Sequence, residues 1–216
     1  MNDLSLTQEY LLCVLGNKGK VSSFSIEKGM CLAAAGLLEL LMDRVVRLDN
    51  EKLSVEKALP EEKKYLRSIF YFIDQKQPVN FKKVVEHYTI TFTDKNINEL
   101  IDDVGSSLAV CGCAKEEKGG LFGGKTHYIP DKEAMDGVIQ NIRAELLEDG
   151  EISEDIVALA ALLDKSGQIK KYFSAYEKDD LKKRLKEIKD NPQNEMIKAV
   201  SDYIETLFVM LVVAAT

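Results

Sequence analysis

The sequence predicts a mainly α-helical protein: a single helical domain, residues 1–216, around a buried four-helix core with two short β-hairpins. Of its 216 residues, 45% are hydrophobic and 30% are charged, so the chain can bury a full core and keep a solvated surface. Segment 30–42 is apolar or glycine at every position except Glu39, which is typical of a helix buried on most sides. Segment 195–214 is apolar on nearly every face from Leu207 onward, which predicts a second buried helix.

Capping and turn residues define the elements of the first third of the chain. Ser5 followed by Gln8 is a capping-box pattern, and the apolar residues after it end at Gly16, which predicts a short first helix. The alternating segments 45–48 and 52–55 flank three turn residues and predict the first hairpin. Pro60 then opens a helix whose apolar residues recur at helical spacing up to about residue 75.

The middle of the chain predicts two helices followed by the second hairpin. The helical patterns are 78–88 and 95–109, and the β-rich connector 89–93 separates them. The second hairpin is predicted from strands 109–113 and 126–129, with the glycine-rich and apolar segment 119–124 as its tip. Further helical patterns follow before the break at Asn191-Pro192, at 135–147, 153–163, 168–176 and 179–188.

Charge and segment lengths limit where the protein works. The 29 basic and 36 acidic side chains give a net charge of −7, which disfavours broad adhesion to DNA or to anionic lipid. Residues 1–6 contain no secretory signal, and the longest apolar run, 207–215, is less than half of the roughly 20 residues that span a bilayer. The four cysteines are expected to be free thiols, which fits a reducing cytosol. We therefore expect a cytoplasmic protein, peripheral on a membrane if it meets one.

The residues that carry enzyme chemistry are not arranged in known motifs, and we expect no enzyme activity, cofactor or metal. Cys111-Gly-Cys113 could in principle be a redox or metal pair, but we interpret it as structural because a zinc site needs four ligands and His87 and His127 stand alone. Segment 119–126 matches the phosphate-loop spacing, yet the β-like residues and proline after it leave no helix N-terminus to hold phosphates. We expect the isolated Glu39 carboxylate to be hydrogen-bonded.

The tip of the second hairpin carries the candidate membrane-contact residues Leu121, Phe122 and Lys125. Insertion of Leu121 and Phe122 would contribute about 1.5–3 kcal/mol each. Lysines beside an anionic leaflet would add about 1 kcal/mol each, and neighbouring glutamates would reduce this; these residues are Lys115, Lys118, Glu116 and Glu117. The alternative is that the loop covers its own protein or contacts another protein.

Several segments share their pattern with a known family. They are 4–12 (LSLTQEYLL), 36–40 (GLLEL) leading into hairpin 45–55, the apolar tip near Leu121, and the ending 194–215. In these the chain resembles the Golgi phosphoprotein 3 family, along essentially its whole length. The resemblance implies a mostly α-helical fold. For eukaryotic members it implies peripheral binding to membranes bearing phosphatidylinositol 4-phosphate and retention of Golgi glycosyltransferases through their cytosolic tails. The expected partner is thus a membrane phospholipid or the cytosolic tail of a membrane protein.

The chain departs from eukaryotic members where they bind the lipid headgroup. They place a tryptophan directly after the phenylalanine that corresponds to Phe24, and this sequence has Ser25 there. Their arginines fall near Ala33 and close to Asn98 and Ile101. The surrounding stretch is acidic, with Glu99, Asp102 and Asp103. A phosphate needs arginine or lysine donors. This chain has neither at the corresponding positions, so the headgroup-binding charges are absent. The chain also starts almost directly at the domain and is similar to a bacterial-type member.

A winged-helix-like nucleic-acid-binding protein is the alternative interpretation. Segments 81–88 and 95–109 and the following hairpin reproduce the order helix, helix, wing. The would-be recognition helix, 95–109, carries three acidic residues against one lysine, whereas DNA readers need positive charge. We therefore expect no nucleic-acid partner and favour a non-enzymatic membrane or phospholipid-binding adaptor.

Overall fold

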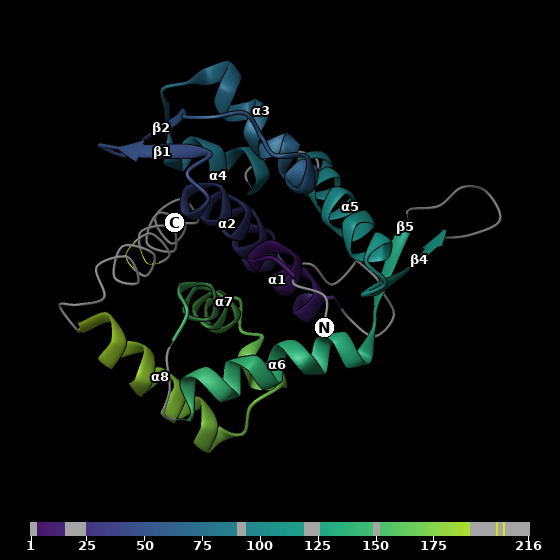
Figure 1. Ribbon diagram of the computed structural model, residues 1–216, viewed down its shortest axis with the longest axis vertical. Helices are drawn as coiled ribbons and strands as arrows, with labels where there is room; N and C mark the ends of the chain where they lie inside the picture. The colour runs from purple at the N-terminus through teal and green to yellow at the C-terminus, as the bar shows by residue number, and fades with distance from the viewer. Residues whose placement is uncertain are drawn as a thin grey trace. The chain divides into compact units, whose positions relative to one another are not determined.

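The computed structural model describes residues 4–15, 25–89, 94–118, 126–148 and 152–190, together with Asp202 and Glu205 (Figure 1). The chain divides into two compact units, Met1–Asp131 and Lys132–Thr216. Both consist mainly of α-helices, so the predicted fold class is confirmed. Within the ranges given above, no helix is both long enough and apolar enough to cross a bilayer.

The first unit is organised around helix α2 (Ile26–Met42), which is buried from residue 29 to residue 40 as the sequence predicts. It contacts α1 (Leu6–Val14), α3 (Arg67–Lys76), α4 (Phe81–Thr89) and α5 (Lys95–Val110). Gly36 allows a close approach of α3, because a Cβ at this position would lie 2.6 Å from Ile69 Cδ1 of that helix. The unit therefore has a helical core with α2 at its centre.

A small antiparallel sheet flanks these helices. Strands β1 (Val46–Asp49) and β2 (Lys52–Val55) form the predicted first hairpin, with Val46 opposite Val55. Both residues of its turn, Asn50 and Glu51, have positive φ angles of 46° and 63°, as the tightest hairpin turns require. Strand β3 (Val79–Asn80) adds to β2. Because residues 79–80 pair with a strand, α4 begins at residue 81 and not at the predicted residue 78. The helix predicted after Pro60 is also divided, into a 3₁₀ turn, η2 (Glu61–Leu66), and α3.

The second hairpin consists of β4 (Ala114–Lys118) and β5 (Thr126–Pro130), and the register places Ala114 opposite Pro130. The prediction of its first strand at 109–113 was wrong, because α5 continues to residue 110 and ends in a Schellman motif. In this motif the Cys113 N–H donates to the Leu108 carbonyl at 2.9 Å, and Gly112 adopts a φ of 76°. The apolar run that resembled a strand is the last turn of a helix.

The second unit contains α6 (Lys132–Leu146), α7 (Glu154–Lys165), the 3₁₀ turn η3 (Ile169–Lys171) and α8 (Ala175–Asp190). The helix predicted at 168–176 was wrong. Ser174 and Glu177 instead form a capping box at the start of α8: the Ser174 N–H donates to Glu177 Oε2 at 2.8 Å, and the Glu177 N–H donates to Ser174 Oγ at 3.2 Å. The predicted helix 195–214, apart from Asp202 and Glu205, and the connector 90–93 lie outside the described residues. The single-domain organisation stays a prediction.

Candidate functional site: the β4–β5 hairpin

The predicted membrane-contact residues Leu121, Phe122 and Lys125 belong to the segment between β4 and β5 and lie outside the described residues. The two strands and helix α5, which leads into them, are described (Figure 1). Thr126, the last residue of the phosphate-loop pattern, is the first residue of β5. A strand follows the pattern where a phosphate-binding loop needs a helix, as the sequence predicts.

Tyr128 anchors the hairpin on α5. Its ring is buried and packs so closely on Gly105 that a Cβ there would lie 2.4 Å from ring atom Cδ2. Its hydroxyl donates to the Asp102 carbonyl at 3.2 Å and lies 3.1 Å from Ser106 Oγ. Burial raises the pKa of Tyr128, and the nearby charges of Asp102 and Glu116 add to the rise. Packing and hydrogen bonds together fix the base of the hairpin to the helix.

Strand β4 is polar and its charges neutralise one another. Ala114 is buried, and the four residues after it are exposed. Lys115 Nζ lies 2.8 Å from Glu117 Oε1, and this hydrogen bond raises the pKa of the lysine. Of the lysines next to the tip, Lys115 is therefore partnered within the strand, and its charge is not available in full to an anionic surface. This agrees with the reduction in lysine attraction that Glu116 and Glu117 predict.

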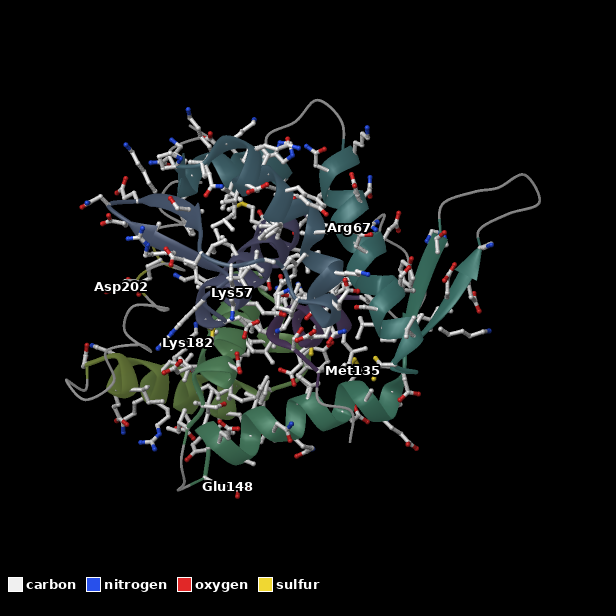
Figure 2. All side chains as sticks on the ribbon, turned by 45° about the horizontal axis from the view of Figure 1, so that its top comes forward. Lys57, Arg67, Met135, Glu148, Lys182 and Asp202 are labelled. Atoms are coloured by element: carbon white, nitrogen blue, oxygen red, sulfur yellow. The ribbon has the colours of Figure 1, made fainter. Side chains whose placement is uncertain are left out.

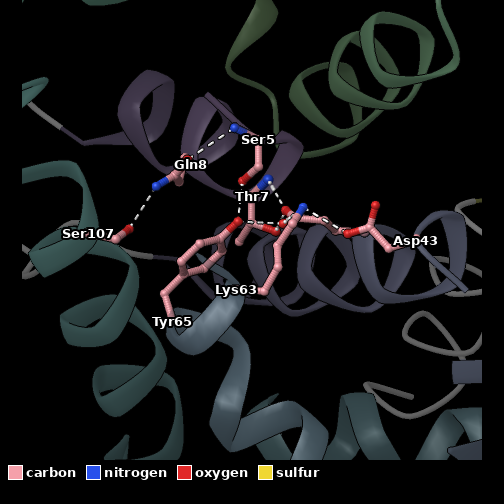
Figure 3. A network of polar contacts seen from close by, with 8 residues as sticks. Ser5, Thr7, Gln8, Asp43, Lys63, Tyr65 and Ser107 are labelled. Carbon is pink, nitrogen blue, oxygen red and sulfur yellow. Dashed lines mark hydrogen bonds and ion pairs between the residues drawn. The ribbon is translucent and has the colours of Figure 1, made fainter. Parts of the chain in front are cut away.

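A second polar cluster lies around Glu39, whose side chain is buried within the first unit (Figure 3). Its Oε2 accepts from the Thr7 N–H at 3.0 Å and from Thr7 Oγ1 at 2.6 Å. Its Oε1 accepts from Lys63 Nζ at 2.7 Å and from the Tyr65 hydroxyl at 2.5 Å. The carboxylate is therefore hydrogen-bonded on both oxygens, as predicted, and joins α1, α2 and η2.

The charge of Glu39 contributes to raised pKa values of its neighbours Lys63 and Tyr65. Burial alone would lower the pKa of Lys63, but hydrogen bonds to Asp43 and Glu39 outweigh it and raise the value. Burial and the charge of Glu39 both raise the pKa of Tyr65, so the phenol stays protonated and donates. All four groups around the carboxylate are donors. This arrangement satisfies a buried charge and leaves no lone pair pointed at a ligand.

The cluster continues toward the helix that carries the hairpin. Gln8 Oε1 accepts from the Ser5 N–H at 3.1 Å, which completes part of the predicted capping box. Its Nε2 donates to Ser107 Oγ of α5 at 3.0 Å (Figure 3). One line of polar contacts thus connects α1 with α5. Among the described residues, no group of histidine, cysteine, aspartate or glutamate side chains is arranged to hold a metal ion.

Comparison with known proteins identifies the family. A sequence model of the Golgi phosphoprotein 3 (GPP34) family matches residues 6–207. The chain belongs to the Golgi phosphoprotein 3 family. The match includes α1 and extends past α8, so it covers nearly the whole sequence and confirms the resemblance predicted from segments 4–12 and 36–40. No curated protein matches the chain at a significant level.

In this Golgi phosphoprotein 3 family member, two of the three positions near the eukaryotic arginines are occupied by core residues, and the third, Asn98, is half-buried. Ala33 of α2 and Ile101 of α5 are each 1% exposed. Asp103 is paired with Arg67 of α3, and Arg67 Nη2 lies 2.7 Å from Asp103 Oδ1. Arg67 is labelled in Figure 2. Burial raises the pKa of Asp103 in spite of this arginine. Glu99 and Asp102 are exposed on the same helix, so this surface does not offer the donors that a phosphate or a DNA backbone needs.

Sequence reasoning missed the residues that position the hairpin. Tyr128 appeared only as part of a strand, and Gly105 as one small residue within an apolar helical pattern. A glycine in a helix interior costs about 1 kcal/mol relative to alanine, so its presence is itself a sign of close packing. The partner could not have been named, because Gly105 and Tyr128 are separated in sequence and meet only through the fold.

Proposed function

We propose that this Golgi phosphoprotein 3 family member is a non-enzymatic adaptor that binds peripherally to membranes by inserting the β4–β5 tip into phospholipid. The observation that carries the proposal is the family match to residues 6–207, because the family implies membrane contact. The sequence supplies Leu121 and Phe122 as the apolar pair for insertion. A cytosolic tail of a membrane protein is the second partner that the family implies.

The hairpin base supports this use of the tip. Tyr128 is held by Gly105 through packing and by Asp102 through a hydrogen bond, so the strands on both sides of the tip have a fixed support. A supported loop loses less conformational entropy on insertion than one without a scaffold. The apolar contribution of two side chains, about 1.5–3 kcal/mol each, then remains available for binding.

The charges of the described surface favour apolar insertion over headgroup recognition. Lys115 is paired with Glu117, and Arg67 is paired with Asp103. Ala33 and Ile101 are buried, and they lie near the positions at which eukaryotic members have arginines. Recognition of a phosphate requires several convergent donors, and these two pairs engage one lysine of β4 and the arginine beside α5 with carboxylates instead.

The test is sedimentation of the full chain with phosphatidylcholine vesicles, comparing the wild type with the double variant Leu121→Asp/Phe122→Asp. Loss of two inserted side chains should lower the affinity at least tenfold, since each 1.4 kcal/mol corresponds to about a tenfold change. The matched control is Val110→Asp/Tyr176→Asp, because these side chains are 89% and 78% exposed and belong to α5 and α8, outside the hairpin tip. It should sediment like the wild type. Equal sedimentation of the tip variant and the wild type would refute the proposal, as would a wild type that binds no vesicles.

A further inference from the structure

We propose that Cys111 and Cys113 form a thiol–disulfide exchange site, at which a glutathione-type disulfide converts the pair into an intramolecular disulfide. All four cysteines are thiols in the structure. The site lies at the junction of α5 and β4, where the helix ends and the hairpin begins. The proposal concerns this junction and does not depend on what the hairpin binds.

Exposure distinguishes Cys111 from the other cysteines. Cys13 and Cys31 are 0% exposed and Cys113 is 4% exposed, whereas Cys111 is only half-buried. Burial, with the nearby charge of Glu9, raises the pKa of Cys13 far above its usual range, so that thiol is inert. A dissolved disulfide therefore reaches Cys111 first. Cys113, one residue beyond Gly112, is the second thiol within reach.

The spacing of the two cysteines in sequence is compatible with a disulfide. Cα atoms two residues apart are separated by at most about 7 Å, and a disulfide needs about 4.4–6.8 Å. Gly112 has a φ of 76°, and this left-handed turn folds the chain more tightly than an extended segment would. The Cys111 thiol donates to the Leu108 carbonyl at 3.2 Å, and the Cys113 thiol lies 3.9 Å from the Cys111 carbonyl. Both thiols thus contact backbone carbonyls of the turn that ends α5.

The reaction has two balanced steps. The Cys111 thiolate attacks one sulfur of glutathione disulfide, the S–S bond of that molecule breaks, and one glutathione leaves and takes up a proton. The Cys113 thiolate then attacks Cys111 Sγ, which forms the intramolecular bond and releases the second glutathione, again with a proton. Two electrons pass from the protein to one glutathione disulfide. A disulfide closing so small a ring is strained, and strained disulfides are readily reduced again.

Oxidation at this place acts on the base of the hairpin. The Asp131 N–H donates to the Cys113 carbonyl at 2.8 Å, and Ala114, the next residue, pairs with Pro130. A bond between Cys111 and Cys113 would fix the buried Cys113 side chain and so constrain this turn. The rate of amide exchange at Asp131 should therefore change on oxidation, while exchange within α2 stays the same.

The test treats the folded, reduced chain with glutathione disulfide and follows it by alkylation and intact mass measurement. The wild type should lose two thiols together and two hydrogen atoms in mass, with the bond located in the peptide that contains Cys111 and Cys113. Excess reduced glutathione should restore both thiols. Persistence of a glutathione adduct on the wild type, oxidation at Cys13 or Cys31 instead, or no loss of thiols would each overturn the proposal.

Two variants assign the roles of the cysteines. Cys113→Ser should accumulate a stable glutathione adduct at Cys111, because the thiol that releases it is gone. Cys111→Ser, at the more exposed position, should lower the rate of thiol loss at least tenfold and form neither product. If Cys113→Ser fails to fold, Cys111→Ser still decides the matter, since thiol loss at the wild-type rate in that variant contradicts the proposal.

Discussion

Glu39 accepts four hydrogen bonds within the core of the first unit, and its replacement should be among the most damaging single changes there. Glu39→Gln turns one acceptor oxygen into a donor facing other donors and leaves Lys63 without one of its two counter-charges. Breaking a buried pair in this way costs about 3–5 kcal/mol. We expect a loss of that order in the free energy of unfolding, measured by urea denaturation.

Glu61→Gln is the matched control for Glu39→Gln, because it removes the same charge from a surface pair. Glu61 pairs with Lys64, and its side chain is 83% exposed. An exposed pair contributes about 0–1 kcal/mol, so this variant should unfold at nearly the wild-type urea concentration. Equal free energies of unfolding for the two variants would show that the cluster around Glu39 contributes no more than a surface contact.

Gly105 is a position where a single methyl group should disturb a contact between elements. The Cβ of Gly105→Ala would lie 2.4–2.6 Å from the ring of Tyr128, and hydrogen-bond partners hold that ring in place. Overpacking costs about 1–3 kcal/mol and exceeds the gain of up to about 1 kcal/mol in helix propensity. We expect faster amide exchange in β4 and β5 and a lower free energy of unfolding.

A double-mutant cycle separates packing from propensity at this contact. In a Tyr128→Ala background the obstructing ring is gone, so Gly105→Ala should stabilise the protein by its helix propensity alone. The sign of the effect therefore reverses between the two backgrounds. The same destabilisation in both would mean that the close approach of Gly105 and Tyr128 is not its cause.

The elements differ in how far the sequence predicts them. Helix α2 follows directly from an apolar pattern interrupted only at Glu39, and the first hairpin follows from its turn residues. The first strand of the second hairpin was misplaced because the apolar residues Val110 and Cys111 fit the pattern of a strand as well as that of a helix end. Gly112, a typical residue after a helix end, was the signal that separates the two. Likewise Ser174 and Glu177 mark the start of α8 with a capping-box pattern.

The partners in the site could not be predicted in the same way. Burial of Glu39 in an apolar helix predicts that it has hydrogen-bond partners, but Thr7 and Lys63 lie far from it in sequence. Their contact with Glu39 depends on how α1 and η2 pack against α2. The same holds for Tyr128 on Gly105. Local patterns therefore predict elements, and contacts between elements require the fold.

The cap of α8 should make the second unit sensitive to acid. Hydrogen bonds from the Ser174 N–H and from Arg143 Nε lower the pKa of Glu177 to about 2, compared with its ordinary value of 4.5. A lowered pKa stabilises the folded state above pH 4.5, and this contribution is lost as the pH falls from 4.5 toward 2. In melting experiments, the difference in Tm between the wild type and Glu177→Gln should narrow over this range.

Glu187→Gln is the control for that pH series, because Glu187 lies on the same helix and its pairs with Lys183 and Arg184 are at the exposed surface. Its difference from the wild type should be small at every pH. A difference in Tm between the wild type and Glu177→Gln that stays constant down to pH 2 would mean that the ionised cap does not stabilise the second unit.

The net charge of −7 predicts how the whole protein should respond to membrane charge. If the tip inserts by apolar contact, adding phosphatidylserine or phosphatidylinositol 4-phosphate to phosphatidylcholine vesicles should change the affinity by less than about tenfold, or about 1.4 kcal/mol. The paired lysine on β4, Lys115, and the acidic surface of α5 are the physical reasons. Lys125→Gln measures the tip lysine separately, through a loss of about 1 kcal/mol on anionic vesicles alone. Binding strengthened far more than tenfold by phosphatidylinositol 4-phosphate, and reversed by salt, would instead place a basic headgroup site elsewhere on the molecule.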